Sequence, residues 1–114
     1  IAALRMRHEI QPPVVEEYKK RMYYASQRVN KLRNMHVPYP PKGTFYLFIN
    51  IKDTGLTSEE VCRRMLEEAH VLMIPGSGFG ICGEGYVRMC CTLPSEELGR
   101  AFDRLGKMSL FKVK

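Results

Sequence analysis

The chain has 114 residues, of which 45% are hydrophobic and 26% charged, and its net charge is +6. This composition is typical of one globular domain with a single core, so we expect residues 1–114 to form one domain. No apolar run approaches the roughly twenty residues of a membrane span, and no signal-peptide pattern opens the chain, which excludes a membrane partner from our expectations.

The first half of the sequence predicts one helix followed by one strand. Pro12 and Pro13 suit a helix start, and apolar residues then recur in steps of three and four, which predicts a helix over 14–35. The segment "HVPYPPKG" ends it, because proline cannot continue a helix. Residues 44–51, "TFYLFINI", are β-branched and aromatic with almost no polar break, and predict a strand buried on both faces.

The second half predicts two helices and two further strands. Thr57 and Glu60 form a capping-box pattern at the start of a helix whose expected buried face is Val61, Met65, Leu66 and Ala69. Strands are predicted at 71–74 and 86–92. Ser95 is the expected cap of a last helix with core residues Leu98, Ala101, Phe102 and Leu105. The order α-β-α-β-β-α predicts an α+β fold, a small mixed sheet of about three strands covered on one face by helices.

The basic residues do not by themselves indicate a nucleic-acid partner. Those between residues 5 and 33 are interspersed with Glu16 and Glu17, as on the solvated face of a helix; they are Arg5, Arg7, Lys19, Lys20, Arg21, Arg28, Lys31 and Arg33. The cysteines, Cys62, Cys82, Cys90 and Cys91, contain no C-x-x-C pair. We therefore expect no metal site and a reducing, cytoplasmic setting.

The stretch "PGSGFGICGEG" contains a formal dinucleotide-binding fingerprint. Gly78, Gly80 and Gly83 give G-x-G-x-x-G, and Asp103 follows about twenty residues later. Such a fingerprint requires a helix after the third glycine, whose N–H groups bind the phosphates. Here a predicted strand follows instead, so we interpret the match as coincidental.

Arg88 lies in the middle of the strand after this loop. Alternation along "YVRMCC" places Val87, Met89 and Cys91 on one face and Arg88 on the other. An arginine in mid-strand is costly unless it has a partner, and its planar fork matches a carboxylate or a phosphate. The alternative is an ion pair with a glutamate on a neighbouring element, or a position at the edge of the sheet.

The runs "PKGTFYLFINI" and "SEEVCRRMLEEAHVLMIPGSGFGICGEGYVRMCCTLPSEELGRAFDRL" strongly resemble the C-terminal small domain of fold-type-I pyridoxal-phosphate aminotransferases, class I/II. The resemblance is dense over residues 40–105 and looser before them. The sequence departs from the pattern at His70, where glycine is usual, and at Met89, where a β-branched residue is usual.

The resemblance implies a site and a role. Arg88 would bind the substrate α-carboxylate, and Phe45 would line the substrate pocket. The alternative for Phe45, an aromatic residue in a strand expected to be buried, is a position in the core. The loop would position the arginine strand without holding the cofactor phosphate, through Gly76, Gly78, Phe79, Gly80, Gly83 and Gly85. Pyridoxal phosphate, its Schiff-base lysine and the large domain would lie outside this chain, whose residues 1–10 would be the tail of an interdomain segment. We expect the chain alone to bind no cofactor and to be inactive.

The resemblance also implies partners and leaves alternatives. The intact enzyme would exchange an amino group between an amino acid and a 2-oxo acid, and would be a homodimer. Carbon-sulfur lyases and aminocyclopropane-carboxylate synthases share the same small domain. The stretch "GEGYVRM" weakly resembles the aromatic strand of a different class of protein, the ferredoxin-like RNA-binding module. Its expected aromatic position holds Met89, so we expect no nucleic-acid partner.

Overall fold

The computed structural model describes residues 1–114 and has the expected order of elements, preceded by one extra helical turn. The helices and strands are α1 (Ala2–Arg5), α2 (Arg7–Asn30), β1 (Tyr46–Asn50), α3 (Ser58–Ala69), β2 (Ile74–Pro75), β3 (Tyr86–Cys90) and α4 (Ser95–Leu105). Three short 3-10 helices occupy Lys52–Thr54, Gly76–Phe79 and Ile81–Gly83. The α+β prediction is confirmed.

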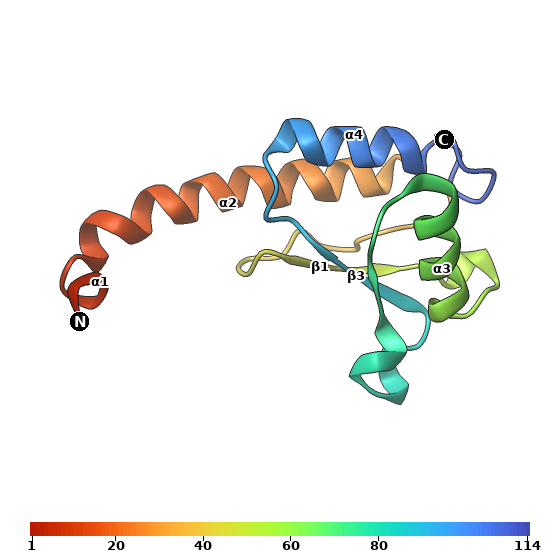
Figure 1. Cartoon of the computed structure of the whole chain (residues 1–114), viewed down its shortest axis with the longest axis horizontal. Coiled ribbons are helices and arrows are strands. Elements are labelled where there is room, and N and C mark those ends of the chain that lie inside the picture. The colour runs from red at the N-terminus through yellow and green to blue at the C-terminus, as the bar shows by residue number, and fades with distance from the viewer.

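Helix α2 begins earlier than its prolines predict. It starts at Arg7 and runs through Pro12 and Pro13, where a start at residue 14 was expected. Its first half projects from the body of the molecule, and every residue from Arg7 to Glu17 is exposed (Figure 1). Water can therefore solvate the two carbonyls that the prolines leave without a donor. No helix of the structure combines the length and apolar character that crossing a membrane requires.

The end of α2 also differs from the expected boundary at residue 35. The helix ends at Asn30, whose side-chain oxygen accepts from the Val37 N–H at 2.8 Å and whose amide donates to the Val37 carbonyl at 3.1 Å. These two bonds fold the following segment back against the helix. The apolar residues Leu32 and Met35 continue into the core without continuing the helix, which is why the periodicity extended the prediction too far.

The sheet has the order β1-β3-β2, with β3 in the centre. Both pairings are antiparallel, so the expectation of a mixed sheet was wrong in strand direction. The physical reason is that α3 carries the chain from β1 to β2, but β3 then inserts between these two strands. Arg88 is thereby paired with Phe48 on one side and Ile74 on the other.

One face of this sheet is covered and the other is open. Helices α2 and α4 lie side by side above the covered face, and α3 packs beside α4 (Figure 1). The core gathers the strand residues that point to them, Leu47, Ile49, Val87 and Met89. The prediction that strand 44–51 is buried on both faces was wrong, since Phe48 is 43% exposed. Aromatic residues favour strands whether or not both faces are covered.

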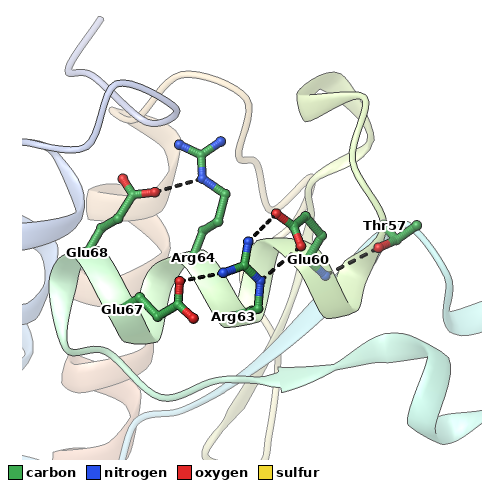
Figure 2. Close-up of polar contacts among 6 residues, drawn as sticks. All are labelled: Thr57, Glu60, Arg63, Arg64, Glu67 and Glu68. Carbon is green, nitrogen blue, oxygen red and sulfur yellow. Dashed lines mark hydrogen bonds and ion pairs between the residues drawn. The ribbon is translucent and has the colours of Figure 1, made fainter.

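Helix α3 begins as predicted. The Thr57 hydroxyl oxygen accepts a hydrogen bond from the Glu60 backbone N–H at 3.2 Å, as Figure 2 shows. The other half of the capping box is replaced, because the Glu60 carboxylate pairs with Arg63 at 2.6 Å. Further ion pairs join Arg63 to Glu67 and Arg64 to Glu68 (Figure 2). Because these ion pairs lie at the surface, each adds little to the free energy of unfolding.

Three smaller expectations were wrong. Leu66 is exposed on α3, and Cys62 is buried there instead. The strand at 71–74 contracts to Ile74–Pro75, because the Val71 N–H bonds to the Met65 carbonyl and closes α3. Ser95 is the first residue of α4 and forms no capping bond, since Pro94 occupies the cap position. The expected core residues of α4, Leu98, Ala101, Phe102 and Leu105, are all buried.

Candidate functional site

The site centres on Arg88, on the open face of the sheet. Val87 and Met89 point into the core on either side of it, so alternation directs the arginine away from the helices. Because β3 is the central strand, hydrogen bonds to β1 and β2 hold the backbone of Arg88 on both sides. The arginine therefore starts from a rigid base.

The Arg88 guanidinium lies between two aromatic rings. Its central carbon is 4.3 Å from the centroid of the Tyr46 ring and 4.9 Å from that of Phe79. Both distances are within the range of cation–π attraction. The alternative expectation, an ion pair with a glutamate on a neighbouring element, is not observed, because Arg88 takes part in none of the ion pairs of the structure.

The Arg88 Nε atom is buried and has no hydrogen-bond partner. A buried donor without an acceptor is rare in folded proteins and costs free energy. The rings on either side cannot supply an acceptor comparable to an oxygen atom. The Nε–H group is thus a hydrogen-bond donor that lacks an oxygen acceptor.

Other aromatic side chains surround this cation. The Phe48 ring meets the Phe79 ring edge-on at 6.3 Å and stacks on the Tyr86 ring at 5.0 Å, with 2° between the planes. The Lys52 ammonium lies over Tyr86, 5.1 Å from the ring centroid. Phe48 and Phe79 remain 43% and 54% exposed. The open face therefore offers one guanidinium within an apolar, aromatic wall.

The glycine loop between β2 and β3 is held by a direct backbone contact. A Cβ atom on Gly76 would lie 2.0 Å from the Gly83 carbonyl oxygen, and one on Gly83 would lie 2.0 Å from the Gly76 carbonyl oxygen. Gly85, which leads into β3, has φ +86°, a conformation that side chains rarely adopt. Gly78 has open space around it and no such φ, so its place in the loop has no steric requirement. Phe79 follows in the same turn and reaches Arg88.

Glu84 fastens this loop to helix α3. Its carboxylate accepts hydrogen bonds from the Ser58 backbone N–H at 2.7 Å and from the Ser58 hydroxyl at 2.9 Å. The Ser58 backbone bond, and then the Ser58 side-chain bond, hold the pKa of the Glu84 carboxyl below its usual range. Sequence reasoning missed this contact. The only available signal is the preference for negative charge at a helix N-terminus. Glu84 and the start of α3 are far apart in the sequence, so the sequence does not show that they meet.

Phe45 lies apart from the arginine. Its ring contacts Tyr18 of α2 at 5.9 Å and Tyr46 at 4.5 Å between centroids. It helps to line a groove of about 230 Å³ between α2 and the segment 41–45, together with Val14, Val15 and Met22. The structure thus brings Tyr46 and Phe79 to Arg88, and not Phe45, whose role in substrate binding stays a prediction.

The cysteines divide by burial. Cys62 and Cys91 are buried, and burial raises their thiol pKa values to about 11 and about 12. Cys82 and Cys90 are exposed, and all four thiols are free. No three His, Cys, Asp or Glu side chains of the structure cluster as ligands for a metal ion.

Comparison with known proteins identifies the family of this chain. The family model "Aminotransferase class I and II" matches residues 1–105. The chain is 45% identical over 109 residues to the aspartate aminotransferase of Pyrococcus abyssi, and 42% identical over 111 residues to aromatic-amino-acid aminotransferase 2 of Thermococcus litoralis. Each alignment covers 94% of this chain and 28% of the relative. The solved structure of the aromatic aminotransferase from Pyrococcus horikoshii OT3 is similar with a TM-score of 0.71 and 43% identity, over 78% of this chain and 23% of that one.

The chain belongs to the class I and II aminotransferase family, which confirms the resemblance seen in the sequence. It spans about 28% of the length of the two curated relatives named above.

Proposed function

We propose that this chain is the substrate-binding small domain of an amino-acid aminotransferase, and that Arg88 binds the α-carboxylate of the substrate. The observation that carries the proposal is the environment of the guanidinium. It faces the uncovered side of the sheet, has no acidic partner, and keeps a buried Nε–H donor without an acceptor.

A carboxylate satisfies these requirements better than other ligands. Its two oxygens match the fork of Nε–H and Nη–H donors on a guanidinium, and the charges attract. The aromatic wall lowers the local polarity, which strengthens such a pair once water is excluded. Two simultaneous bonds fix the orientation of the ligand as well as its position, so Arg88 would hold the reacting end of an amino acid in one geometry.

The residues of this chain fit the substrate rather than the cofactor of the family. Pyridoxal phosphate supplies the electron sink of amino-group transfer when bound, and it needs a lysine and several donors for its phosphate. The open face presents a single guanidinium, and the ammonium of Lys52 lies over Tyr86. We therefore place the cofactor outside this chain, with an amino acid and a 2-oxo acid as the substrates of the complete enzyme. Its assembly as a homodimer in the cytoplasm stays a prediction.

Replacing Arg88 with lysine in the complete polypeptide tests the proposal. Arg88→Lys keeps the positive charge and removes the fork, so we expect the KM for the amino acid to rise roughly 30-fold, equivalent to about 2 kcal/mol. Steady-state kinetics with the amino acid as varied substrate measures the change. The matched control is Arg100→Lys on α4, a side chain that is 60% exposed and paired only with Glu97. An unchanged KM for Arg88→Lys would contradict the proposal.

A further inference from the structure

The two rings that flank Arg88 come from opposite sides of its strand. Tyr46 belongs to β1, which pairs with one edge of β3, and Phe79 follows β2, which pairs with the other edge. The guanidinium is therefore enclosed across the strand by two separate segments. No hydrogen bond or ion pair contributes to holding it, so the rings are the groups that fix its orientation.

An aromatic ring offers a guanidinium cation–π attraction but no oxygen acceptor, so the Arg88 Nε–H donor stays without a hydrogen-bond partner. Cation–π attraction draws the cation to the face of an aromatic ring, whereas a carboxylate binds through hydrogen bonds from the N–H groups. An acidic partner would hold Arg88 equally well, but it would occupy the fork that the ligand needs. Aromatic partners thus restrict the side chain without competing with the substrate, and they reduce the rotamer entropy lost on binding.

The Phe79 ring is itself supported. Phe48 meets it edge-on at 6.3 Å, and Phe48 is stacked in turn on Tyr86. The turn that carries Phe79 begins at Gly76, whose backbone touches that of Gly83. The position of Phe79 is consequently set by packing on one side and by backbone contact on the other, although the ring is 54% exposed.

We propose that Tyr46 and Phe79 are positioning residues, which hold the Arg88 guanidinium so that its fork faces the ligand. This inference rests on the proposed function, since it assigns the two rings a role in carboxylate binding. It predicts that the ring of Tyr46 matters and its hydroxyl does not, because that hydroxyl takes part in none of the hydrogen bonds of the structure and the guanidinium lies over the ring.

Nuclear magnetic resonance of the 114-residue chain tests the positioning directly. The Arg88 Nε–H resonance, assigned by its loss in Arg88→Lys, should be shifted by the ring currents of Tyr46 and Phe79 and protected from exchange with water. In Tyr46→Leu we expect the resonance to move toward that of an exposed arginine and to exchange faster. Tyr46→Phe should restore the wild-type position. Phe79→Leu, at an exposed ring, gives a second test if Tyr46→Leu fails to fold.

Titration with sodium acetate, against sodium chloride at equal ionic strength, tests the link to binding. We expect Tyr46→Leu and Phe79→Leu each to weaken acetate affinity roughly tenfold, a factor that corresponds to 1.4 kcal/mol. Tyr23→Leu, at an exposed tyrosine of α2 outside the site, is the matched control and should bind as the wild type does. In the complete polypeptide, Tyr46→Leu should raise KM for the amino acid more than it lowers kcat, and Tyr46→Phe should reverse the effect.

The outcomes separate this inference from the function on which it rests. If Tyr46→Leu and Phe79→Leu fold and leave both the resonance and the acetate affinity unchanged, while Arg88→Lys abolishes acetate binding, the positioning role is wrong and the carboxylate site stands. If the wild type shows no acetate-dependent shift at Arg88 and Arg88→Lys leaves KM unchanged, the proposed function is wrong, and the positioning role fails with it.

Discussion

The reactivity of each cysteine in this chain depends on whether its thiol is buried or exposed. The thiolate is the reactive form, and a buried thiol ionises only at high pH. The pKa values of Cys62 and Cys91 are raised to about 11 and about 12, first of all by burial, and both side chains are shielded. Cys82 and Cys90 lie at the surface, although Cys90 is the direct neighbour of Cys91.

Alkylation with iodoacetamide at pH 8 should therefore label Cys82 and Cys90 and spare Cys62 and Cys91. We expect two modified thiols in the native chain and four after denaturation in guanidinium chloride, with sites identified by peptide mass spectrometry. Labelling of Cys91 at the rate of Cys90 in the native chain would show that the core next to the end of β3 is accessible, contrary to the structure.

Arg88 also shows what a sequence can say at the scale of one residue. Alternation along β3 places it opposite Val87 and Met89, and the structure agrees. The sequence did not predict that Tyr46 and Phe79 contact Arg88, because these contacts depend on the register of β1 and on the path of the glycine loop. Neither is encoded by a local pattern.

At the scale of elements, α3 is fixed at both ends by unusual contacts. Its C-cap residue, His70, adopts the left-handed conformation, with φ 53° and ψ 41°. Glycine occupies this conformation without the steric cost that a Cβ atom introduces. The His70 N–H and the Val71 N–H still bond to the Leu66 and Met65 carbonyls and complete the turn.

Replacing His70 with glycine should stabilise the fold. We expect His70→Gly to raise the free energy of unfolding by about 1 kcal/mol, the gain from the relieved cap exceeding the entropy that glycine adds to the unfolded chain. Urea denaturation monitored by circular dichroism gives the value. His70→Ala is the matched control, since alanine keeps the Cβ atom. An equal gain in His70→Ala would rule out the left-handed conformation as the cause.

The N-terminal end of α3 depends on Glu84 and should make the stability of the fold sensitive to acid. The pKa of this carboxyl is lower in the folded chain, because the Ser58 backbone and hydroxyl groups bond to its charged form. A carboxyl whose folded-state pKa is lowered contributes stability above its unfolded pKa, about 4.3. That contribution is lost as the pH falls through the lower, folded-state pKa.

Glu84→Gln should therefore be less stable than the wild type at neutral pH, and the difference should shrink as the pH falls below about 4.3. Urea denaturation at a series of pH values from neutral to strongly acidic measures it. Glu16→Gln on α2 is the control, because Glu16 is exposed, lies away from the helix N-terminus and takes part in none of the ion pairs. A difference between Glu84→Gln and the wild type that persists unchanged in acid would contradict the ion–dipole role of Glu84.

At the scale of the whole molecule, the helices and the core were predicted better than the sheet. Helical periodicity reports directly which residues face the core, and the predicted positions of α4 are all buried. The sheet depends on the order in which strands meet, which a sequence pattern does not state: β3 inserts between β1 and β2. The start of α2 was misplaced because Pro12 and Pro13 are tolerated where the helix stands in solvent.

That solvent-exposed half of α2 should open more easily than the rest of the molecule. The buried residues of α2 begin only at Met22, so the amides of 14–20 are protected by local helix bonds and by little tertiary contact beyond that of Tyr18 with Phe45. We expect these amides to exchange with deuterated water about a hundredfold faster than those of 25–29, as measured by hydrogen-exchange mass spectrometry. Equal protection of the two segments would show that the first half is packed in solution, contrary to Figure 1.

The close approach of the Gly76 and Gly83 backbones limits which amino-acid substitutions this loop can accept during evolution. Each position leaves room for only a hydrogen atom because the other is so near, and the obstacle at each is a carbonyl group rather than a movable side chain. Neither site can take a larger residue first and wait for its counterpart to adapt. Substitutions are therefore expected at positions between them that have open space, such as Gly78, whereas Gly76 and Gly83 should both remain glycine.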